Sequence, residues 1–313
     1  MSGRSRKIVV GALVVFIGLP AAFIFAVLAW GYLSDTTNGS IVSSGVTRRY
    51  LQYVPKTYDQ SRPTPLVISI HAGATWPAFE RNVSRWNELA NQYGFIVVYP
   101  AGSGAFFGTY ARGASIWPAG PHSLPQDVRF ISDLIDKFEA DYSIDPSRIY
   151  ADGMSNGGGM AFLLSCKLSD RIAAVGVVSG ALPGTLEECG DSKPIPTIAF
   201  HGTADKVAPF LGGRSPIAPG LFPSIPDWTA RVASRNQCKG DRSDTRISPQ
   251  VRRLAYTNCA ENADVVLYTI EGAGHSWPGG KPLPEWIFGR TTSEISASRV
   301  MWEFFVQHPR GTK

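Results

Sequence analysis

The sequence lacks the residue patterns with which several classes of protein bind their ligands. No run of lysine or arginine is interleaved with aromatic residues, which disfavours a nucleic-acid-binding surface. The five histidines and four cysteines do not form the paired spacings of a zinc site, and no glycine-rich loop precedes a phosphate-binding lysine. We therefore expect no cofactor, no metal and no nucleic-acid partner.

Cysteine is scarce, and all four cysteines lie in the second half of the chain. Four cysteines allow three pairings, and an even number outside the cytoplasm favours disulfides over free thiols. We expect Cys166 to pair with Cys189 and Cys238 with Cys259, because each pair brackets one local excursion of the chain. Buried free thiols remain the alternative. None of the four has the neighbours expected of a catalytic thiol.

Charge is absent from residues 8–33, an apolar run long enough to cross the hydrocarbon core of a bilayer as a helix. Trp30 and Tyr32 stand where an interfacial belt would lie. Three basic residues precede the run and supply much of the net charge of +5, namely Arg4, Arg6 and Lys7. A cleavable signal usually has a shorter apolar region, which favours an uncleaved anchor, although Val27 and Ala29 would satisfy the small-residue rule for cleavage.

The remainder of the chain has the size and composition of one exported domain. We expect a signal-anchor or signal peptide over residues 1–34, a polar tether over 35–45 and one catalytic domain over 46–313. The expected location is extracytoplasmic, either anchored to the membrane by the N-terminal helix or secreted.

A serine at the end of a short strand carries the first sign of chemistry. Residues 147–151 have the pattern of a buried strand, and residues 160–166 that of an apolar helix. Between them stands Ser155, with Gly153 and Gly157 on either side, which is the spacing of a nucleophile elbow. A structural serine in a glycine-rich turn is the alternative. The elbow favours Ser155 as a catalytic nucleophile, with the N–H of Asn156 directed toward a developing oxyanion.

A nucleophilic serine needs a base and a carboxylate that orients the base, and both follow in chain order. Asp205 lies in the loop after a strand at residues 195–200, and His275 lies in a glycine-rich loop after a strand at 265–270. We therefore predict Asp205 as the acid and His275 as the base. The other histidines fail on order or position, and they are His71, His122, His201 and His308. Two further aspartates are better explained as turn or cap residues, namely Asp152 and Asp227.

The second oxyanion donor is expected in the loop after a strand at residues 66–70. The N–H of Gly73 or Ala74 fits this role, and an ordinary strand-to-helix turn is the alternative interpretation. Two loop-rich insertions, residues 101–125 and 207–226, are expected to build the substrate pocket. Candidate substrate contacts are Trp277, Trp117 and Thr75, although aromatic residues in these loops could equally form a hydrophobic plug.

The order of strands and helices predicts an α/β fold with a mostly parallel sheet covered by helices on both faces. Further strands are expected at residues 49–54, 95–99 and 172–178. Helices are expected at 79–93 and 126–142 and from residues 227 and 292 onward.

These residues resemble a known family, the polyhydroxybutyrate depolymerase-like and feruloyl esterase-like α/β-hydrolases of carbohydrate esterase family 1. The resemblance rests on Gly-Met-Ser-Asn-Gly-Gly at the elbow, His-Gly-Thr-Ala-Asp at the acid and Gly-His-Ser-Trp-Pro-Gly-Gly at the base. A helix that opens at Asp127 and the last helix are also similar. The family's usual His-Gly of the oxyanion loop reads His71-Ala72-Gly73 here, and the loop before Asp127 lacks cysteines that many relatives carry.

The resemblance implies an exported carboxylic ester hydrolase. With the triad above, the predicted function is hydrolysis of aromatic, feruloyl-type esters or of short hydroxyacyl esters, the partner being a small ester or oligoester. The alternatives are a polyester depolymerase, a peptidase on the same fold and a catalytically silent surface-binding protein on a hydrolase scaffold.

Overall fold

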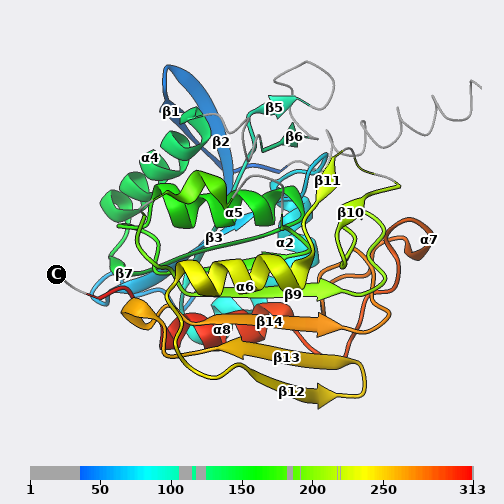
Figure 1. Cartoon of the computed structure of the whole chain (residues 1–313). Helices are drawn as coiled ribbons and strands as arrows, with labels where there is room; N and C mark the ends of the chain where they lie inside the picture. Colours follow the sequence, from blue (N-terminus) through cyan, green and yellow to red (C-terminus); the bar gives the residue numbers. More distant parts are fainter. Residues whose placement is uncertain are drawn as a thin grey trace, which may run out of the picture.

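The computed structural model describes residues 36–105, 115–117, 125–181, 186–190, 192–216, 218 and 220–311 of the 313-residue chain. Its centre is a ten-stranded sheet with the strand order β1-β2-β4-β3-β7-β8-β9-β14-β13-β12 (Figure 1). The six central strands run parallel, and they are β4 (Ile96–Pro100), β3 (Thr64–Ile70), β7 (Ile144–Met154), β8 (Ala174–Val178), β9 (Thr197–Gly202) and β14 (Val265–Ile270).

Antiparallel strands complete the sheet at both margins, and these are β1 (Gly39–Ser43), β2 (Val46–Tyr53), β13 (Val251–Tyr256) and β12 (Ser243–Ser248). Two separate ribbons pair β5 (Gly104–Ala105) with β6 (Ser115–Ile116) and β10 (Gly213–Arg214) with β11 (Leu221–Phe222). Every residue of β3, β4 and β8 is buried, because strands in the middle of such a sheet have helices on both faces.

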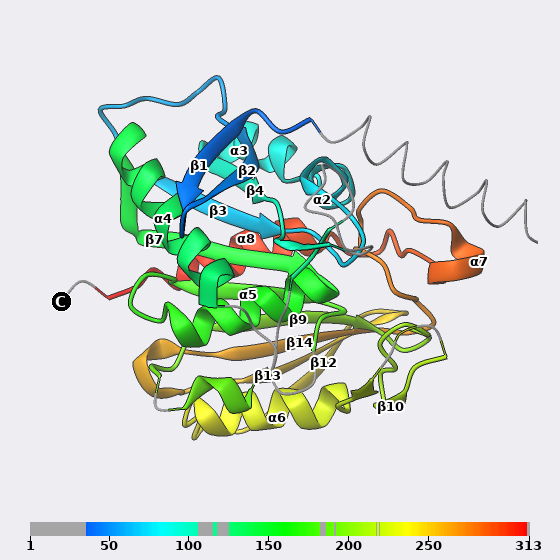
Figure 2. The same cartoon turned by 90° about the horizontal axis from the view of Figure 1, so that it is seen from above.

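Helices cover the two faces of the sheet (Figures 1 and 2). One face carries α4 (Pro125–Asp141), α5 (Asn156–Lys167) and α6 (Ile225–Arg235), and the other carries α2 (Pro77–Ser84), α3 (Trp86–Tyr93) and α8 (Ala297–Gln307). On the second face, Trp302 stacks on Phe95 with ring centroids 4.1 Å apart, and Phe305 stacks on Tyr150 at 4.7 Å. Short helices lie in loops, namely η2 (Glu187–Cys189), η3 (Ala260–Asn262) and α7 (Glu285–Phe288). The predicted doubly covered, mostly parallel sheet is confirmed.

Three local predictions were wrong. The helix expected at 79–93 is divided into α2 and α3 by Arg85, whose φ of 59° lies in the left-handed region and ends α2. The last helix begins at Ala297, where the Ser296 hydroxyl accepts from the N–H of Arg299, and not at residue 292. Residues 39–43, expected to belong to the tether, form β1 and pair with β2 along their whole length. These five residues contain only two apolar side chains, which are adjacent, so their sequence shows no strand periodicity.

The apolar run at residues 8–33 lies outside the described residues, as do residues 1–34 of the expected anchor or signal peptide. Within the described part of the chain, no helix combines the length and apolar character needed to span a bilayer.

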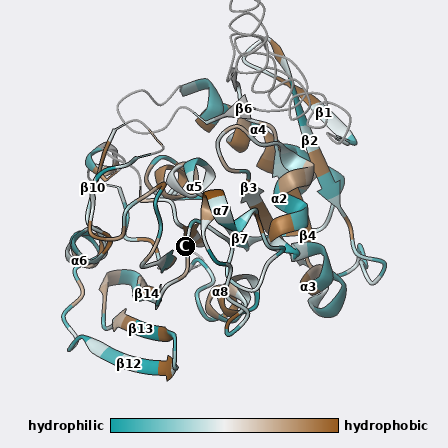
Figure 3. Ribbon diagram, turned by 90° about the vertical axis from the view of Figure 1, so that its right-hand side faces the viewer, coloured by the Kyte–Doolittle hydropathy of each residue, from teal (hydrophilic) through white to brown (hydrophobic). Residues whose placement is uncertain are grey.

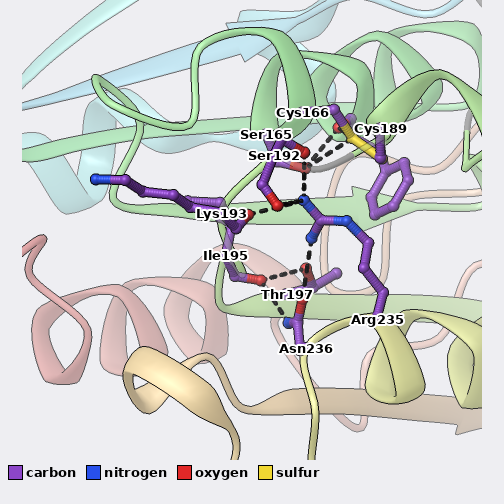
Figure 4. The surroundings of a disulfide bond; sticks show 10 residues. Ser165, Cys166, Cys189, Ser192, Lys193, Ile195, Thr197, Arg235 and Asn236 are labelled. Atoms are coloured by element: carbon purple, nitrogen blue, oxygen red, sulfur yellow. Dashed lines mark hydrogen bonds between the residues drawn. A yellow bond between two sulfur atoms is a disulfide. The ribbon is translucent and has the colours of Figure 1, made fainter.

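Both predicted disulfides are present. Cys166, in α5, is bonded to Cys189, in η2, and Cys238 is bonded to Cys259. Beside the first disulfide, the Arg235 guanidinium donates to the carbonyl oxygens of Ser192 and Lys193 (Figure 4). Arg235 therefore joins the end of α6 to the segment that follows the disulfide.

Candidate active site

Ser155 stands at the turn between β7 and α5, with backbone angles of φ 56° and ψ −122°. A serine rarely adopts a positive φ, so the surrounding structure must hold it there. Its N–H donates to the carbonyl of Val178 at 2.7 Å, and its carbonyl accepts from the N–H of Gly159 at 3.0 Å. The strained turn leaves the Ser155 side chain partly exposed beyond the end of the sheet.

The two glycines of the elbow are required by close backbone contacts. A Cβ on Gly157 would lie 2.1 Å from the carbonyl oxygen of Ile70 and 2.5 Å from that of His71. A Cβ on Gly153 would lie 2.6 Å from the Gly157 carbonyl and from Ile70 O. Neither distance is possible for real atoms, so only glycine allows the elbow to pack against the end of β3.

The predicted acid and base are in direct contact. Nδ1 of His275 lies 2.8 Å from Oδ2 of Asp205, and both side chains are buried. Oδ1 of Asp205 accepts from the backbone N–H groups of Val207 and Ala208, each at 2.8 Å. A carboxylate accepts only, so Nδ1 of His275 carries the hydrogen and Nε2 is the basic nitrogen. This is the tautomer that a general base needs.

The carboxylate of Asp205 is ionised in spite of its burial. Burial by itself raises the pKa of this group, but the adjacent imidazoles of His275 and His201 and their hydrogen bonds hold the pKa of Asp205 well below its ordinary value. A negative charge therefore lies beside Nδ1 of His275.

The three predicted residues come from neighbouring strand ends at one edge of the sheet. Ser155 follows β7, Asp205 follows β9, and His275 follows β14, and β8 is the strand between β7 and β9. Figure 3 views the molecule from this edge, where α2, α5, α7 and β10 surround the ends of the central strands. Within the described residues, Ser155 Oγ makes no hydrogen bond to His275, a contact that in unliganded hydrolases is often long and shortens when substrate binds.

The expected oxyanion loop lies against the elbow. A Cβ on Gly73 would lie 3.3 Å from the Cβ of Asn156, which brings the loop close to the residue after Ser155. Ala74 has a φ of 60°, and the Thr75 hydroxyl donates to the carbonyl of Ala72 at 2.7 Å. His71 links this loop to the segment after β4. Its Nδ1 contacts Ala72 O at 2.8 Å, and its Nε2 accepts from the N–H of Gly102 at 3.0 Å. Burial lowers the pKa of His71 to about 4, so its ring is neutral.

The Asn156 side chain binds a neighbouring loop by two hydrogen bonds. Its Oδ1 accepts from the N–H of Trp117 at 2.6 Å, and its Nδ2 donates to the carbonyl of Trp117 at 2.7 Å. The carboxamide therefore bonds both backbone groups of Trp117, as a neighbouring β-strand would. Sequence reasoning considered only the backbone N–H of Asn156.

Two of the expected substrate contacts are buried in the protein. Trp277 is 1% exposed, and its Nε1 donates to the Ser298 hydroxyl at 2.9 Å. Trp117 is also 1% exposed, with its ring 5.5 Å from that of His71. Both rings pack inside the domain in this structure, and contact of these indoles with substrate stays a prediction. Thr75 is partly exposed, but its hydroxyl is engaged by the loop.

The sequence did not reveal a buried acidic pair, since Asp152 has the pattern of a turn residue. Asp152 lies within β7, and its Oδ1 accepts from Ser69 Oγ at 2.8 Å and from Trp86 Nε1 at 3.0 Å. In the part of the chain that the structure describes, its Oδ2 and both carboxyl oxygens of Glu80 lack hydrogen-bond partners. Burial raises the pKa of Asp152 to about 7, and burial together with repulsion from Asp152 raises the pKa of Glu80 well above its ordinary value. No charge pattern in the sequence distinguishes these carboxyls from exposed ones.

Over the described ranges, no group of three or more His, Cys, Asp or Glu side chains is arranged to hold a metal ion.

Comparison with known proteins adds to this geometry. The family description Esterase PHB depolymerase matches residues 48–192. A candidate esterase called NocK, from Nocardia uniformis subsp. tsuyamanensis, is 30% identical over 297 residues, which cover 87% of this chain and 83% of NocK. Feruloyl esterase B of Piromyces equi is 29% identical over 241 residues, which cover 75% of this chain and 44% of that protein, so the chain spans less than half of that relative.

Among solved structures, an acetyl xylan esterase from Aspergillus awamori superimposes with a TM-score of 0.59 over 86% of this chain and 98% of that one. The sequence identity is 15%, so this likeness shows a shared fold.

Proposed function

This chain belongs to the Esterase PHB depolymerase family and is a carboxylic ester hydrolase, and we propose that Ser155, His275 and Asp205 are its catalytic triad. The observation that carries the proposal is the hydrogen bond of 2.8 Å between His275 Nδ1 and Asp205 Oδ2, at the sheet edge where the Ser155 elbow also lies. The hydrogen bond to Asp205 leaves Nε2 of His275 free to accept a proton. This arrangement serves catalysis only if a nucleophile lies within reach of Nε2.

The reaction is a two-step acyl transfer. His275 Nε2 takes the proton of Ser155 as Oγ bonds to the ester carbonyl carbon, and the carbonyl oxygen becomes an oxyanion. The protonated Nε2 then gives its proton to the leaving alkoxide oxygen as the carbon–oxygen bond breaks. Water repeats both steps on the acyl-enzyme and releases the carboxylic acid, and Ser155 regains its proton.

The oxyanion is held by two backbone N–H groups, one from Asn156 at the start of α5 and one from Gly73 or Ala74. The contact between Gly73 and Asn156 supports this role because it brings the two loops to the same place. The positive end of the α5 macrodipole adds to the stabilisation of the negative charge.

Labelling with a fluorophosphonate tests the triad directly. We expect one adduct, on Ser155, and none in the Ser155→Ala variant. The Asp205→Asn variant should label at least a hundredfold more slowly, because an amide cannot hold His275 in the required tautomer. Folded wild-type protein that forms no adduct on Ser155 would show that the site is silent and would favour the surface-binding alternative.

The substrate class is proposed to be aromatic, feruloyl-type esters or short hydroxyacyl esters. Support comes from the relatives named feruloyl esterases and from the family description, which names a polyhydroxybutyrate depolymerase. Turnover should be compared on p-nitrophenyl acyl esters, methyl ferulate, hydroxybutyrate oligomers and peptide anilides. Cleavage of the anilides without cleavage of any ester would refute the class, and the release of soluble products from solid polyester would establish the depolymerase alternative.

The location is proposed to be extracytoplasmic, with residues 8–33 serving as a membrane anchor or as a signal peptide. Two disulfides support an oxidising compartment. Retention of the full chain in carbonate-washed membranes would favour the anchor, and recovery of a shortened chain from the medium would favour the signal peptide.

A further inference from the structure

The catalytic carboxylate has two imidazole neighbours, and only one belongs to the proposed triad. Besides His275, Oδ2 of Asp205 lies 3.3 Å from Nε2 of His201. His201 is the fifth residue of β9, and its side chain is as deeply buried as that of Asp205. His201 precedes the acid in the chain and so does not fit the order expected of a triad base.

The hydrogen on His201 is located by its other contact. Nε2 of His201 lies 2.8 Å from the carbonyl oxygen of Ala208, which can only accept a hydrogen bond. Nε2 therefore carries the hydrogen and donates it to Ala208, and Oδ2 of Asp205 lies 3.3 Å from the same nitrogen. The ring packs against Phe210 with centroids 6.0 Å apart, which limits its rotation.

This contact places a second imidazole beside a carboxylate that already accepts three hydrogen bonds. Oδ1 accepts from the N–H groups of Val207 and Ala208, and Oδ2 accepts from Nδ1 of His275 and lies 3.3 Å from Nε2 of His201. Because His201 binds Ala208 as well, it closes the turn whose N–H groups hold Oδ1. Among the described residues, the titratable groups that act on Asp205 are His275 and His201.

We propose that His201 is a positioning residue for the esterase reaction, which holds the Asp205 carboxylate ionised and directed toward His275. This role rests on the proposed triad. His201 does not touch the reacting atoms, and its effect reaches Ser155 through Asp205 and His275. A purely structural role, in which the ring only supports the Ala208 turn, would alter stability without altering how the triad binds protons.

The test compares three variants of the full chain. His201→Phe keeps a ring and removes the donor, whereas His201→Gln can bring an amide N–H to the position of Nε2. His308→Phe is the matched control, since His308 is also buried and its Nδ1 contacts the carbonyl of Phe304 at 2.7 Å. If His201→Phe does not fold, His201→Leu replaces it as the variant without a donor.

The measurement is the pH dependence of the fluorophosphonate labelling rate of Ser155, together with thermal unfolding of each variant. Loss of a donor raises the proton affinity of the Asp205–His275 pair, so we expect the acid limb of the profile of His201→Phe to move upward by about 0.5–1 pH unit. On the acid limb, near pH 6, its labelling should be about three- to tenfold slower than that of the wild type. His201→Gln should restore the wild-type limb, and His308→Phe should change only the unfolding temperature.

If the acid limb of the pH profile does not move in His201→Phe, or in His201→Leu where that variant replaces it, the positioning role of His201 is overturned and the proposed function remains intact. The role would also be overturned if His201→Gln or His308→Phe shifted the limb as much as His201→Phe. Wild-type protein without an adduct on Ser155 would overturn the proposed function itself, and this role with it.

Discussion

At the scale of single residues, Asn156 contacts two segments that lie beside the nucleophile, the oxyanion loop and the segment around Trp117. Its backbone N–H is the first proposed oxyanion donor, and its side chain forms two hydrogen bonds with the backbone of Trp117. Its Cβ also packs against Gly73. The oxyanion loop and the segment around Trp117 are therefore positioned by the same residue.

Replacing Asn156 by alanine keeps the backbone N–H and removes both side-chain bonds. We expect a loss of ~2 kcal/mol in the free energy of unfolding, since each bond contributes ~1 kcal/mol net. Ser155 should still react with a fluorophosphonate, though more slowly. Urea titration measures the stability, and Asn91→Ala is the control, because Asn91 is exposed and makes a single bond with Tyr53. Equal losses in the two variants would refute a special role for the Asn156 side chain.

At the scale of elements, the elbow depends on how closely α5 approaches the end of β3. That approach is set by Gly157, where a side chain would overlap two carbonyl oxygens of the β3 end. The backbone fixes the position of a Cβ, and the atoms it would meet are backbone carbonyl oxygens, so no change of rotamer can relieve the overlap.

The Gly157→Ala variant should therefore lose ~3 kcal/mol or more of stability, the upper range for an overpacked site. Whatever folds should have its Ser155 displaced and its esterase activity reduced at least a hundredfold. Gly311→Ala is the matched control, because no atom lies within 4 Å of its would-be Cβ. Near-normal activity in Gly157→Ala would contradict the close approach of the two backbones.

The disulfide between Cys238 and Cys259 links the segment after α6 to the segment after β13. Cys238 and Cys259 are 21 residues apart, and a loop of that length is expected to contribute ~3 kcal/mol by restricting the unfolded chain. The double variant Cys238→Ser with Cys259→Ser should lose about this amount in a guanidinium titration. Its activity at temperatures well below unfolding should stay close to that of the wild type, and a large loss of activity there would show that the bond shapes the site.

At the scale of the whole molecule, the Glu80–Asp152 pair connects stability to pH. Glu80 lies in α2, which follows the oxyanion loop, and Asp152 lies in β7, which ends just before Ser155. Both have a pKa in the folded protein above the ordinary value, so the folded state holds protons that the unfolded chain releases near pH 4. Their contribution to stability is thus complete at low pH and is lost as pH rises through the folded pKa values.

The raised pKa of Asp152 lowers the free energy of unfolding by ~1.4 kcal/mol for each pH unit between pH 4 and about 7. His71 acts in the opposite direction between about pH 4 and its ordinary pKa, because its folded pKa is lowered. The comparison must therefore be made between wild type and Asp152→Asn. We expect the stability advantage of the wild type over this variant to shrink steadily from pH 4 to 7, as measured by chemical unfolding at each pH. Asp170→Asn, at an exposed position, should show no such trend, and a difference independent of pH in Asp152→Asn would contradict the buried protonated state.

The sequence by itself determined the chain order of the predicted triad residues and the α/β fold that carries them. Local patterns predicted a strand, a glycine-flanked serine and a helix at Ser155, and buried strands ahead of Asp205 and His275, because backbone geometry and periodicity are properties of short segments. The parallel sheet and both disulfide pairs followed from the same local order.

Only the tertiary structure decided which side chains are buried and what they contact. It buried Trp277 and Trp117, placed His201 beside Asp205 and brought Glu80 under the elbow next to Asp152. It also assigned residues 39–43 to the sheet. These facts depend on contacts between segments far apart in the chain, and burial and electrostatic environment arise only when those segments pack together.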